Sequence, residues 1–307
     1  MLRLNGILMI IIGSMLWGAT GPLMEWLLEN MKLTVTFLLV IRLIVAGILL
    51  LLILAIRKKD ILAVWKKPLW RNQLILFSIF GMLGMQYTFV SAIEASNAVL
   101  ATLLQFSAPI FIVIYVSLVH KNFPPRYQII GIVGTLIGLI MLLTKGSVSS
   151  LVVSKEAILW GVGLGLTFAF YTLYPARLMK EWDILIIVGW SMLIGGIVLG
   201  MVSQVWKAEE WSILAQPNVA FMLSALLLFG TMAFVFFLCS MKYISAVETS
   251  VLSTFEPLTA MVISVIWFGT SLDIVQLLGV VIMLVFVTWL SVGGNSKATV
   301  GEEMTIT

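Results

Sequence analysis

The sequence predicts an all-α membrane protein with ten transmembrane helices, and three observations lead to this fold class. Apolar residues make up 61% of the 307 positions, charged residues only 10%, and the mean hydropathy is +1.14. A soluble domain usually carries about 25% charged residues, because its surface faces water. The second observation is the length of the apolar runs. The third is that Lys and Arg together are concentrated in every other connection between these runs.

The apolar runs have the length that a membrane requires. A helix crosses ~30 Å of hydrocarbon with about 20 apolar residues, because each residue advances it by about 1.5 Å. The segments between the runs are too short for an appended soluble enzyme or nucleic-acid-binding module. The expected spans are residues 6–26, 36–56, 73–93, 98–119, 127–144, 157–178, 184–204, 219–240, 246–268 and 274–292.

The basic residues predict the orientation of these spans. Cytoplasmic loops of membrane proteins carry an excess of Lys and Arg, so the richer side is expected to be cytoplasmic and to hold both termini. The richer side collects thirteen: Arg3, Arg57, Lys58, Lys59, Lys66, Lys67, Arg71, Lys121, Arg126, Arg177, Lys180, Lys242 and Lys297. The opposite side collects four: Lys32, Lys145, Lys155 and Lys207.

Two stretches of the chain resemble each other when one is shifted by 148 residues. The shift places Pro109 on Pro257, and it places Gln128 and Gly131 on Gln276 and Gly279. Chance similarity of apolar strings is the alternative, but a coincident mid-helix proline and a coincident Gln-x-x-Gly favour a repeat. Because each repeat contains five spans, an odd number, the second copy must enter the membrane from the opposite face.

The repeat defines the expected organisation. Residues 1–144 form the first five-helix repeat and residues 157–292 the second. Residues 145–156 are an extracellular connecting loop, and the polar residues 293–307 are a disordered cytoplasmic tail. Inverted repeats place a binding site near the middle of the membrane and permit alternating access.

The sequence offers little for catalysis or for metal binding. Cys239 and His120 are each the only residue of their type, so a disulfide framework and a His-rich metal site are excluded. No Walker loop and no HExxH motif occurs. We therefore expect no enzymatic activity, no cofactor and no metal, and any energy source would be a gradient of protons or solute rather than ATP bound by this chain.

Four motifs resemble those of one family. Residues 14–22 (SMLWGATGP) resemble the first-helix LWG signature of EamA-type proteins in the drug/metabolite transporter superfamily, and Arg42 resembles their second-helix arginine. Residues 168–174 (FAFYTLY) are similar to the sixth-helix WAxYT pattern, and residues 256–260 (EPLTA) match the ninth-helix EPxxA pattern. The chain departs from the family at the ends of the fourth and ninth helices, where a Gly-Glu pair is common.

The resemblance implies secondary active transport, with export of a small organic solute such as an amino acid, amine, metabolite or drug. The location it implies is the bacterial plasma membrane, where lipid and solute are the partners and protons are a candidate coupling ion. A flippase for a lipid-linked or lipid-like substrate is the alternative within transport. A membrane-embedded enzyme and a sensor are the alternatives from other classes.

Glu256 is the leading candidate for a coupling or substrate-binding residue. An ionisable side chain is costly inside a membrane unless it is paired or faces water. Thr249, Ser253 and Glu256 share one helix face by their spacing, and Gln105 lies on the matching face of the repeat-related helix. We expect these faces to line a cavity between the repeats; simple helix packing is the alternative.

Arg42 lies about six residues into the second span and is expected to be a structural intramembrane charge. An ion pair inside the bundle, with Glu25 or Glu256 as the partner, or snorkelling to the outer surface explains it at least as well as substrate contact, and the sequence leaves these open. Four prolines are expected to interrupt helices near a central site: Pro22, Pro109, Pro175 and Pro257. Aromatic side chains near these breaks are candidates to line a solute cavity: Trp17, Tyr87, Tyr171 and Tyr174.

Overall fold

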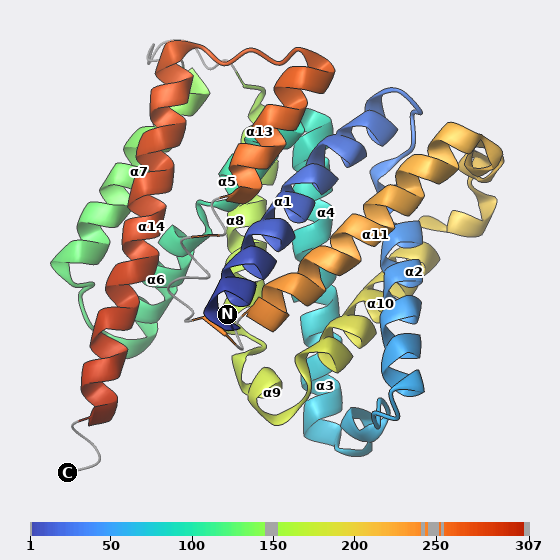
Figure 1. The fold of residues 1–307 in the computed structure, drawn as a ribbon, viewed down its shortest axis with the longest axis horizontal. Coiled ribbons are helices and arrows are strands. Elements are labelled where there is room, and N and C mark those ends of the chain that lie inside the picture. The colour runs from blue at the N-terminus through green and yellow to red at the C-terminus, as the bar shows by residue number, and fades with distance from the viewer. Residues whose placement is uncertain (1, 145–152, 241–242, 245–251, 253–254, 304–307) are drawn as a thin grey trace.

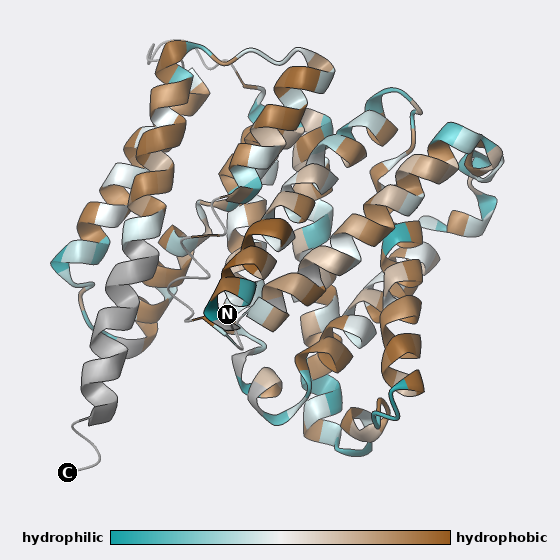
Figure 2. Cartoon of the chain, in the orientation of Figure 1, coloured by the Kyte–Doolittle hydropathy of each residue, from teal (hydrophilic) through white to brown (hydrophobic). Residues whose placement is uncertain are grey.

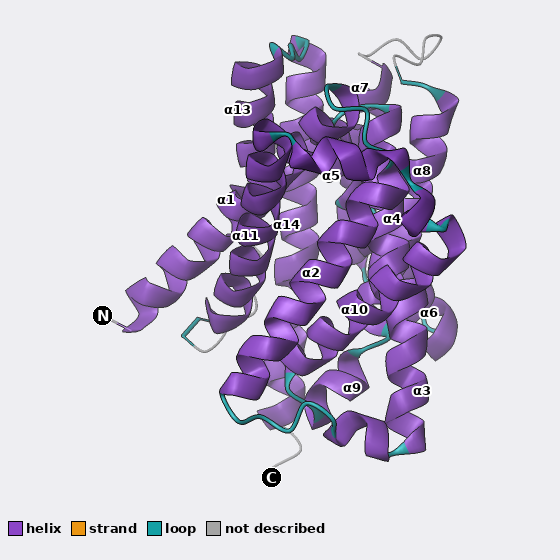
Figure 3. Ribbon diagram, turned by 90° about the vertical axis from the view of Figure 1, so that its right-hand side faces the viewer, coloured by secondary structure: helices purple, strands orange, loops and turns teal. Residues whose placement is uncertain are grey.

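Every regular element in the described part of the chain is a helix, as the computed structural model shows (Figures 1 and 3). The structure describes residues 2–144, 153–240, 243–244, 252 and 255–303. Its helices, in chain order, are α1 (Leu2–Glu29), α2 (Val35–Ile56), η1 (Ala63–Lys66), α3 (Pro68–Leu76), η2 (Phe77–Leu83), α4 (Gly84–Ala95), α5 (Ala98–Gln105), α6 (Ala108–His120), α7 (Arg126–Thr144), α8 (Lys155–Leu173), α9 (Ala176–Glu181), α10 (Ile184–Ser203), η3 (Val205–Lys207), η4 (Glu209–Ala215), α11 (Pro217–Ser240), α13 (Phe255–Phe268) and α14 (Ile274–Glu303).

Within the described residues, eight helical segments are long and apolar enough to cross a membrane. They are Arg3–Glu29, Val35–Ile56, Pro68–Ala95, Ala98–Val119, Arg126–Thr144, Lys155–Met179, Ile184–Ser203 and Pro217–Phe237. Two further apolar helices are shorter, Phe255–Phe268 and Ile274–Trp289. The observed helices lie within a few residues of the predicted spans, with two exceptions: part of the ninth predicted span falls outside the described residues, and α14 continues beyond the tenth.

The outer faces of the helices carry large apolar side chains. On α7, Ile130 is 53% exposed and Val133 is 50% exposed; on α14, Val281 is 53% exposed and Val285 is 57% exposed. Hydrophobic residues run along the helices, whereas hydrophilic residues gather in the connections at their ends (Figure 2). Such a surface would be unfavourable in water and is suited to lipid.

The helices pack in pairs drawn from the two halves of the chain. The most extensive contacts join α2 to α10, α7 to α14 and α1 to α11, followed by α4 with α8 and α1 with α13. The helix α1 also contacts α5, and α8 contacts both α5 and α6. Each of these interfaces except α1–α5 therefore joins the first half of the chain to the second.

Glycines permit the closest of these approaches. A Cβ atom on Gly138 would lie 2.6 Å from the carbonyl oxygen of Gly279, and one on Gly279 would lie 2.7 Å from the oxygen of Gly138. In the α2–α10 interface, a Cβ atom on Gly47 would lie 2.7 Å from the backbone nitrogen of Leu193. Small residues that let two backbones meet are a common basis of helix association in membranes.

Two contacts define the ends of the bundle. The carboxylate of Glu25, near the end of α1, accepts a hydrogen bond from the backbone of Ala98, where α5 begins. Ser154, which precedes α8, donates to the carbonyl oxygen of Ala95, where α4 ends. The helix α1 therefore starts at one end of the bundle and α8 starts at the other, while α1 begins and α14 finishes on the same side (Figures 1 and 3).

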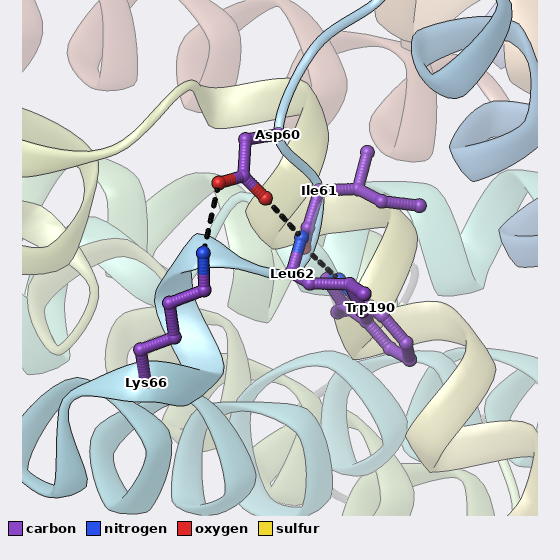
Figure 4. Close-up of polar contacts among 5 residues, drawn as sticks. All are labelled: Asp60, Ile61, Leu62, Lys66 and Trp190. Atoms are coloured by element: carbon purple, nitrogen blue, oxygen red, sulfur yellow. Dashed lines mark hydrogen bonds and ion pairs between the residues drawn. The ribbon is translucent and has the colours of Figure 1, made fainter.

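The connection after α2 is attached to α10 by polar contacts (Figure 4). The indole nitrogen of Trp190 donates to the carbonyl oxygen of Ile61 at 2.8 Å. Nearby, Lys66 donates to Asp60 at 3.2 Å, and this hydrogen bond lowers the pKa of the Asp60 carboxyl. Lys59 also forms an ion pair of 3.2 Å with Asp183, just before α10. This end of the α2–α10 pair is held through its loops as well as through its helices.

The structure corrects one prediction about the proline residues. Pro22 was expected to interrupt the first helix, but α1 is continuous from Leu2 to Glu29. A proline removes one backbone hydrogen bond, and here the packing of α1 against α11, α13 and α5 supports the helix on either side of the missing bond. Helices do change at two other prolines: Pro109 follows the break between α5 and α6, and Pro175 separates α8 from α9.

The C-terminal segment also differs from its prediction. Residues 293–307 were expected to be a disordered tail, whereas α14 extends as a helix to Glu303. The expectation rested on the polar composition of the segment that follows Gly293. Glycine in a helix lowers its stability by only about 1 kcal/mol relative to alanine, and no proline follows to stop the helix.

Candidate functional site

Glu256 lies in the first turn of α13 and is buried, with 9% of its surface exposed. The amide nitrogen of Gln105, the last residue of α5, donates to its carboxylate at 3.4 Å. The structure thus brings together two polar residues whose helix faces were expected to line a cavity between the repeats; that they line such a cavity stays a prediction. Pro257 follows Glu256 directly, whereas Pro109 lies in the first turn of α6, after the break that follows Gln105.

Helix α1 forms a wall beside this pair. A Cβ atom on Gly18 would overlap the backbone carbonyl oxygen of Glu256, so only glycine permits the observed approach. The adjacent Trp17 packs edge to face on Phe237 of α11, with ring centroids 5.9 Å apart. The Trp-Gly pair of the first helix therefore connects α1 to both α11 and α13.

Two of the predicted residues fall outside the described part of the chain. Thr249 and Ser253 were expected to share a face with Glu256, and the structure does not describe either of them. Their participation in the site stays a prediction.

The three candidate tyrosines make aromatic contacts along α4, η2 and α8. Tyr171 stacks on Phe77 of η2 at 5.4 Å, and Tyr87 of α4 meets Trp160 of α8 edge to face at 5.9 Å. The ring of Tyr174, at the end of α8, stacks on Phe170 at 4.7 Å. These contacts give the tyrosines a packing role between α4, η2 and α8.

Arg42 has a partner that the sequence analysis did not consider. Its guanidinium nitrogen Nη1 donates to the side-chain oxygen of Gln86 at 2.7 Å and also contacts the sulfur of Met24 at 3.8 Å. The side chain is only 7% exposed. The expected ion pair with Glu25 or Glu256 is therefore wrong for the described residues, because a neutral amide on α4 takes that position.

Glu25 has a different role from the one expected. It lies within α1, and only 4% of its surface is exposed. Its carboxylate accepts the backbone N–H of Ala98 at 2.8 Å, while the side chain of Asn97 accepts that of Leu100 at 2.8 Å. Two of the N–H groups that α5 leaves unpaired at its start are thereby satisfied, and a negative charge there is favoured by the helix dipole.

A cavity of about 290 Å³ opens at this same end of α5. It lies between the start of α5, the end of α7 and the connection from α13 to α14, with Asn97, Ser154, Thr270 and Gln276 among its lining residues. Gln105 ends the helix about 12 Å further along, given about 1.5 Å per residue. The cavity and the Glu256–Gln105 pair thus lie at opposite ends of α5.

Sequence reasoning missed two residues beside Arg42, namely Gln86 and Gly230. Gln86 is a buried polar residue within an apolar span, and that alone was a signal that it has a partner. Gly230 lies beside Arg42, since a Cβ atom placed on it would be 3.5 Å from Nη2. A single glycine in an apolar helix carries no comparable signal.

Comparisons with known proteins agree with this architecture. The model of the EamA-like transporter family matches residues 4–144 and 155–292. A Salmonella typhimurium protein described as the uncharacterized inner membrane transporter YicL is 32% identical over 295 residues, which is 96% of this chain and 97% of that protein. The uncharacterized transporter YyaM of Bacillus subtilis is 24% identical over 215 residues, or 68% of this chain and 70% of YyaM.

A solved crystal structure shares the fold. It superposes with a TM-score of 0.61 at 13% identity and covers 94% of this chain and 97% of its own. The family model accounts for both halves of the chain, and the membrane-length apolar helices agree with the setting of the YicL relative. The chain belongs to the EamA-like transporter family and is a multi-pass transporter of the bacterial cell membrane.

Proposed function

We propose that this transporter is a secondary active exporter of a small organic solute, such as an amino acid, amine, metabolite or drug. It works by alternating access, and Glu256 is the residue that couples transport to protons. The observation that carries the proposal is the contact of the buried Glu256 with Gln105, which joins the two halves of the chain. A buried carboxylate of this kind in a membrane protein is a functional candidate by default.

An architecture of two inverted five-helix repeats, residues 1–144 and 157–292, supports alternating access. When the ten proposed spans are numbered in chain order, exchanging the two repeats maps the contact between spans 2 and 7 (α2–α10) onto itself. It does the same for the contact between spans 5 and 10 (α7–α14). The same exchange maps the contact between spans 1 and 8 (α1–α11) onto the contact between spans 3 and 6 (α4–α8). Interfaces that map onto one another in this way are what two similar halves would produce, and such halves can rock about a central site.

The opposite entry of α1 and α8 supports the inversion. The last turns of α1 lie beside Ala98, at the start of α5, so α1 begins at the opposite end of the bundle. The helix α8 begins beside the end of α4, which is the end of the bundle where α1 finishes. An even number of spans, ten in this proposal, accounts for α1 and α14 having their outer ends on one side. The distribution of Lys and Arg assigns that side to the cytoplasm.

The chemistry of the pair suits proton exchange. An ionised carboxylate can only accept hydrogen bonds, and the Gln105 amide nitrogen donates one to it. Once protonated, the carboxyl becomes a donor, and the amide can rotate to offer its oxygen instead. Gln105 can therefore form a hydrogen bond with Glu256 in either protonation state of the carboxyl. In this proposal a proton and a solute compete for the Glu256 site.

The test is proton movement in proteoliposomes that enclose a pH-sensitive dye and contain the purified protein. Solutes from the four classes are added outside, without any imposed pH gradient. We expect at least one solute to move protons across the membrane in protein-containing vesicles and in none of the protein-free ones. Solute flux that leaves the internal pH unchanged would overturn the coupling, and vesicles without any solute flux would count against the transport proposal as a whole.

A further inference from the structure

The guanidinium of Arg42 uses only part of its hydrogen-bonding capacity. It carries five N–H groups in a rigid planar fork, and its two contacts with described residues, Gln86 and Met24, both involve Nη1. Among those residues, no acceptor lies within hydrogen-bonding distance of Nε or Nη2. These two nitrogens form one edge of the guanidinium, the edge that binds a planar oxyanion through two parallel hydrogen bonds.

The charge of Arg42 is also unbalanced among the described residues. Glu25 accepts from the backbone at the start of α5, and Glu256 accepts from Gln105. Gln86, the residue that meets the guanidinium, is neutral. A buried cation inside a membrane is unfavourable without a counter-charge, so this arrangement favours an anion that arrives from elsewhere.

A glycine of α11 faces the free edge. Gly230, in the middle of α11, faces it: a Cβ atom there would be 3.5 Å from Nη2, 4.0 Å from Nε and 3.9 Å from the methyl carbon of Thr20. The hydroxyl of Thr20 is engaged, since it donates to the carbonyl oxygen of Trp17 at 2.7 Å. Position 230 therefore places no side-chain atom against the Nε–Nη2 edge, and the methyl group of Thr20 lies alongside.

We infer that the Nε–Nη2 edge of Arg42, together with Gly230, is a subsite for the carboxylate group of the transported solute. The inference rests on the proposed transport function and narrows its substrate to carboxylate-bearing molecules. One guanidinium balances one negative charge, which matches a carboxylate; a phosphate monoester carries about two at neutral pH. The intramembrane charge that was expected to be structural thereby gains a part in recognition.

The experiment measures the thermal unfolding midpoint of the purified protein in detergent, without any gradient. Matched probe pairs are 3-phenylpropionate with 3-phenylpropionamide, and benzoate with benzamide, each titrated at constant ionic strength. We expect carboxylates to raise the midpoint of the wild-type protein and the amides to leave it unchanged. In Arg42→Gln the half-saturating carboxylate concentration should rise by on the order of tenfold or more, because a charged hydrogen-bond donor is lost.

Two further variants keep the test decisive if Arg42→Gln does not fold. Gln86→Glu places a carboxylate on the guanidinium and should remove the response to added carboxylates. Gly230→Ala adds a methyl group beside the Nε–Nη2 edge and should weaken that response. Gly163→Ala is the matched control, because its Cβ atom would also have its nearest neighbour at 3.5 Å, on Thr88; it should respond as the wild type does.

The inference is overturned if no carboxylate raises the midpoint, if the amides act equally, or if Gln86→Glu and Gly230→Ala keep the full carboxylate response. Its failure is distinguishable from failure of the proposed function, because binding is measured here in detergent and proton coupling is measured separately in vesicles. Proton movement with amines alone would retain the transport proposal and reject the carboxylate subsite.

Discussion

Gly18 and Glu256 meet through their backbones, with the α-carbon of Gly18 placed where any Cβ atom would overlap the carbonyl oxygen of Glu256. The same hypothetical atom would lie 3.0 Å from the Cβ of Thr259. The contact joins the Leu-Trp-Gly motif of the first helix to the Glu-Pro motif of the ninth span. The position of the Glu256 side chain consequently depends on how closely α1 approaches α13.

The first prediction concerns this contact. Gly18→Ala should destabilise the protein by about 1–3 kcal/mol or more, because an added methyl in a packed site forces the surroundings to shift and a backbone atom yields less than a side chain. Thermal unfolding of the purified variant in detergent measures the effect. Gly163→Ala, whose Cβ atom would meet nothing closer than 3.5 Å, serves as the control. Equal midpoints for the two variants would show that α1 and α13 are not held together in this way.

The second prediction concerns the partner of Arg42. Gln86→Leu should lower the stability by on the order of 1.5–3 kcal/mol, the range for hydrogen bonds to charged groups. Gln73→Leu is the comparison, because the side-chain oxygen of Gln73 is buried without a hydrogen-bond partner among the described residues. Replacing it by an apolar group should therefore cost less. A larger loss for Gln73→Leu than for Gln86→Leu would contradict the assigned role of Gln86.

The third prediction concerns the start of α5. Glu25→Ala should destabilise the protein by about 1–3 kcal/mol, because the buried N–H of Ala98 loses its acceptor. Thr34→Ala removes a partly exposed cap from α2, where the Thr34 hydroxyl accepts from Phe37 at 3.3 Å, and should cost only about 1 kcal/mol. Thermal unfolding of both variants under one set of conditions gives the order. The reverse order would argue against Glu25 as the cap of α5.

The fourth prediction concerns orientation in the membrane. Reporter fusions at the C-terminus should give a cytoplasmic signal, and fusions within residues 145–156 should give an extracellular one. The reason is the Lys and Arg excess on the side that holds the termini, together with the odd number of spans proposed for each repeat. If both reporters lie on one side of the membrane, the arrangement of ten spans in two inverted repeats is wrong.

The helices could be predicted from sequence because their length is set by the membrane. An apolar run of about 20 residues is a strong and local signal, and α2 at Val35–Ile56 differs from its predicted span, 36–56, by a single residue. Gln105 and Glu256 were also accessible as candidates, because the internal repeat placed them on matching helix faces, although their direct contact was not predicted. Both predictions used information contained within one helix or one repeat.

The partner of Arg42 could not be predicted in the same way. Opposite charge favoured Glu25 and Glu256, but which helices surround a side chain depends on packing between distant segments, here α2 against α4 and α1. The tyrosines are a similar case, because an aromatic residue near a helix break fits a cavity wall and a packed interface equally well. Only the rings of Phe77 and Trp160 beside them identify the interface.

The central claim is that Glu256 couples solute movement to protons, and Glu256→Gln tests it most directly because it keeps the shape of the side chain and removes its charge. The measurement is transport in proteoliposomes with and without an imposed pH gradient, beside Glu209→Gln, an exposed Glu-to-Gln control. The account predicts that Glu256→Gln loses pH-dependent uphill transport and retains solute exchange, while the control behaves as wild type. Uphill transport by Glu256→Gln with unaltered pH dependence would contradict it.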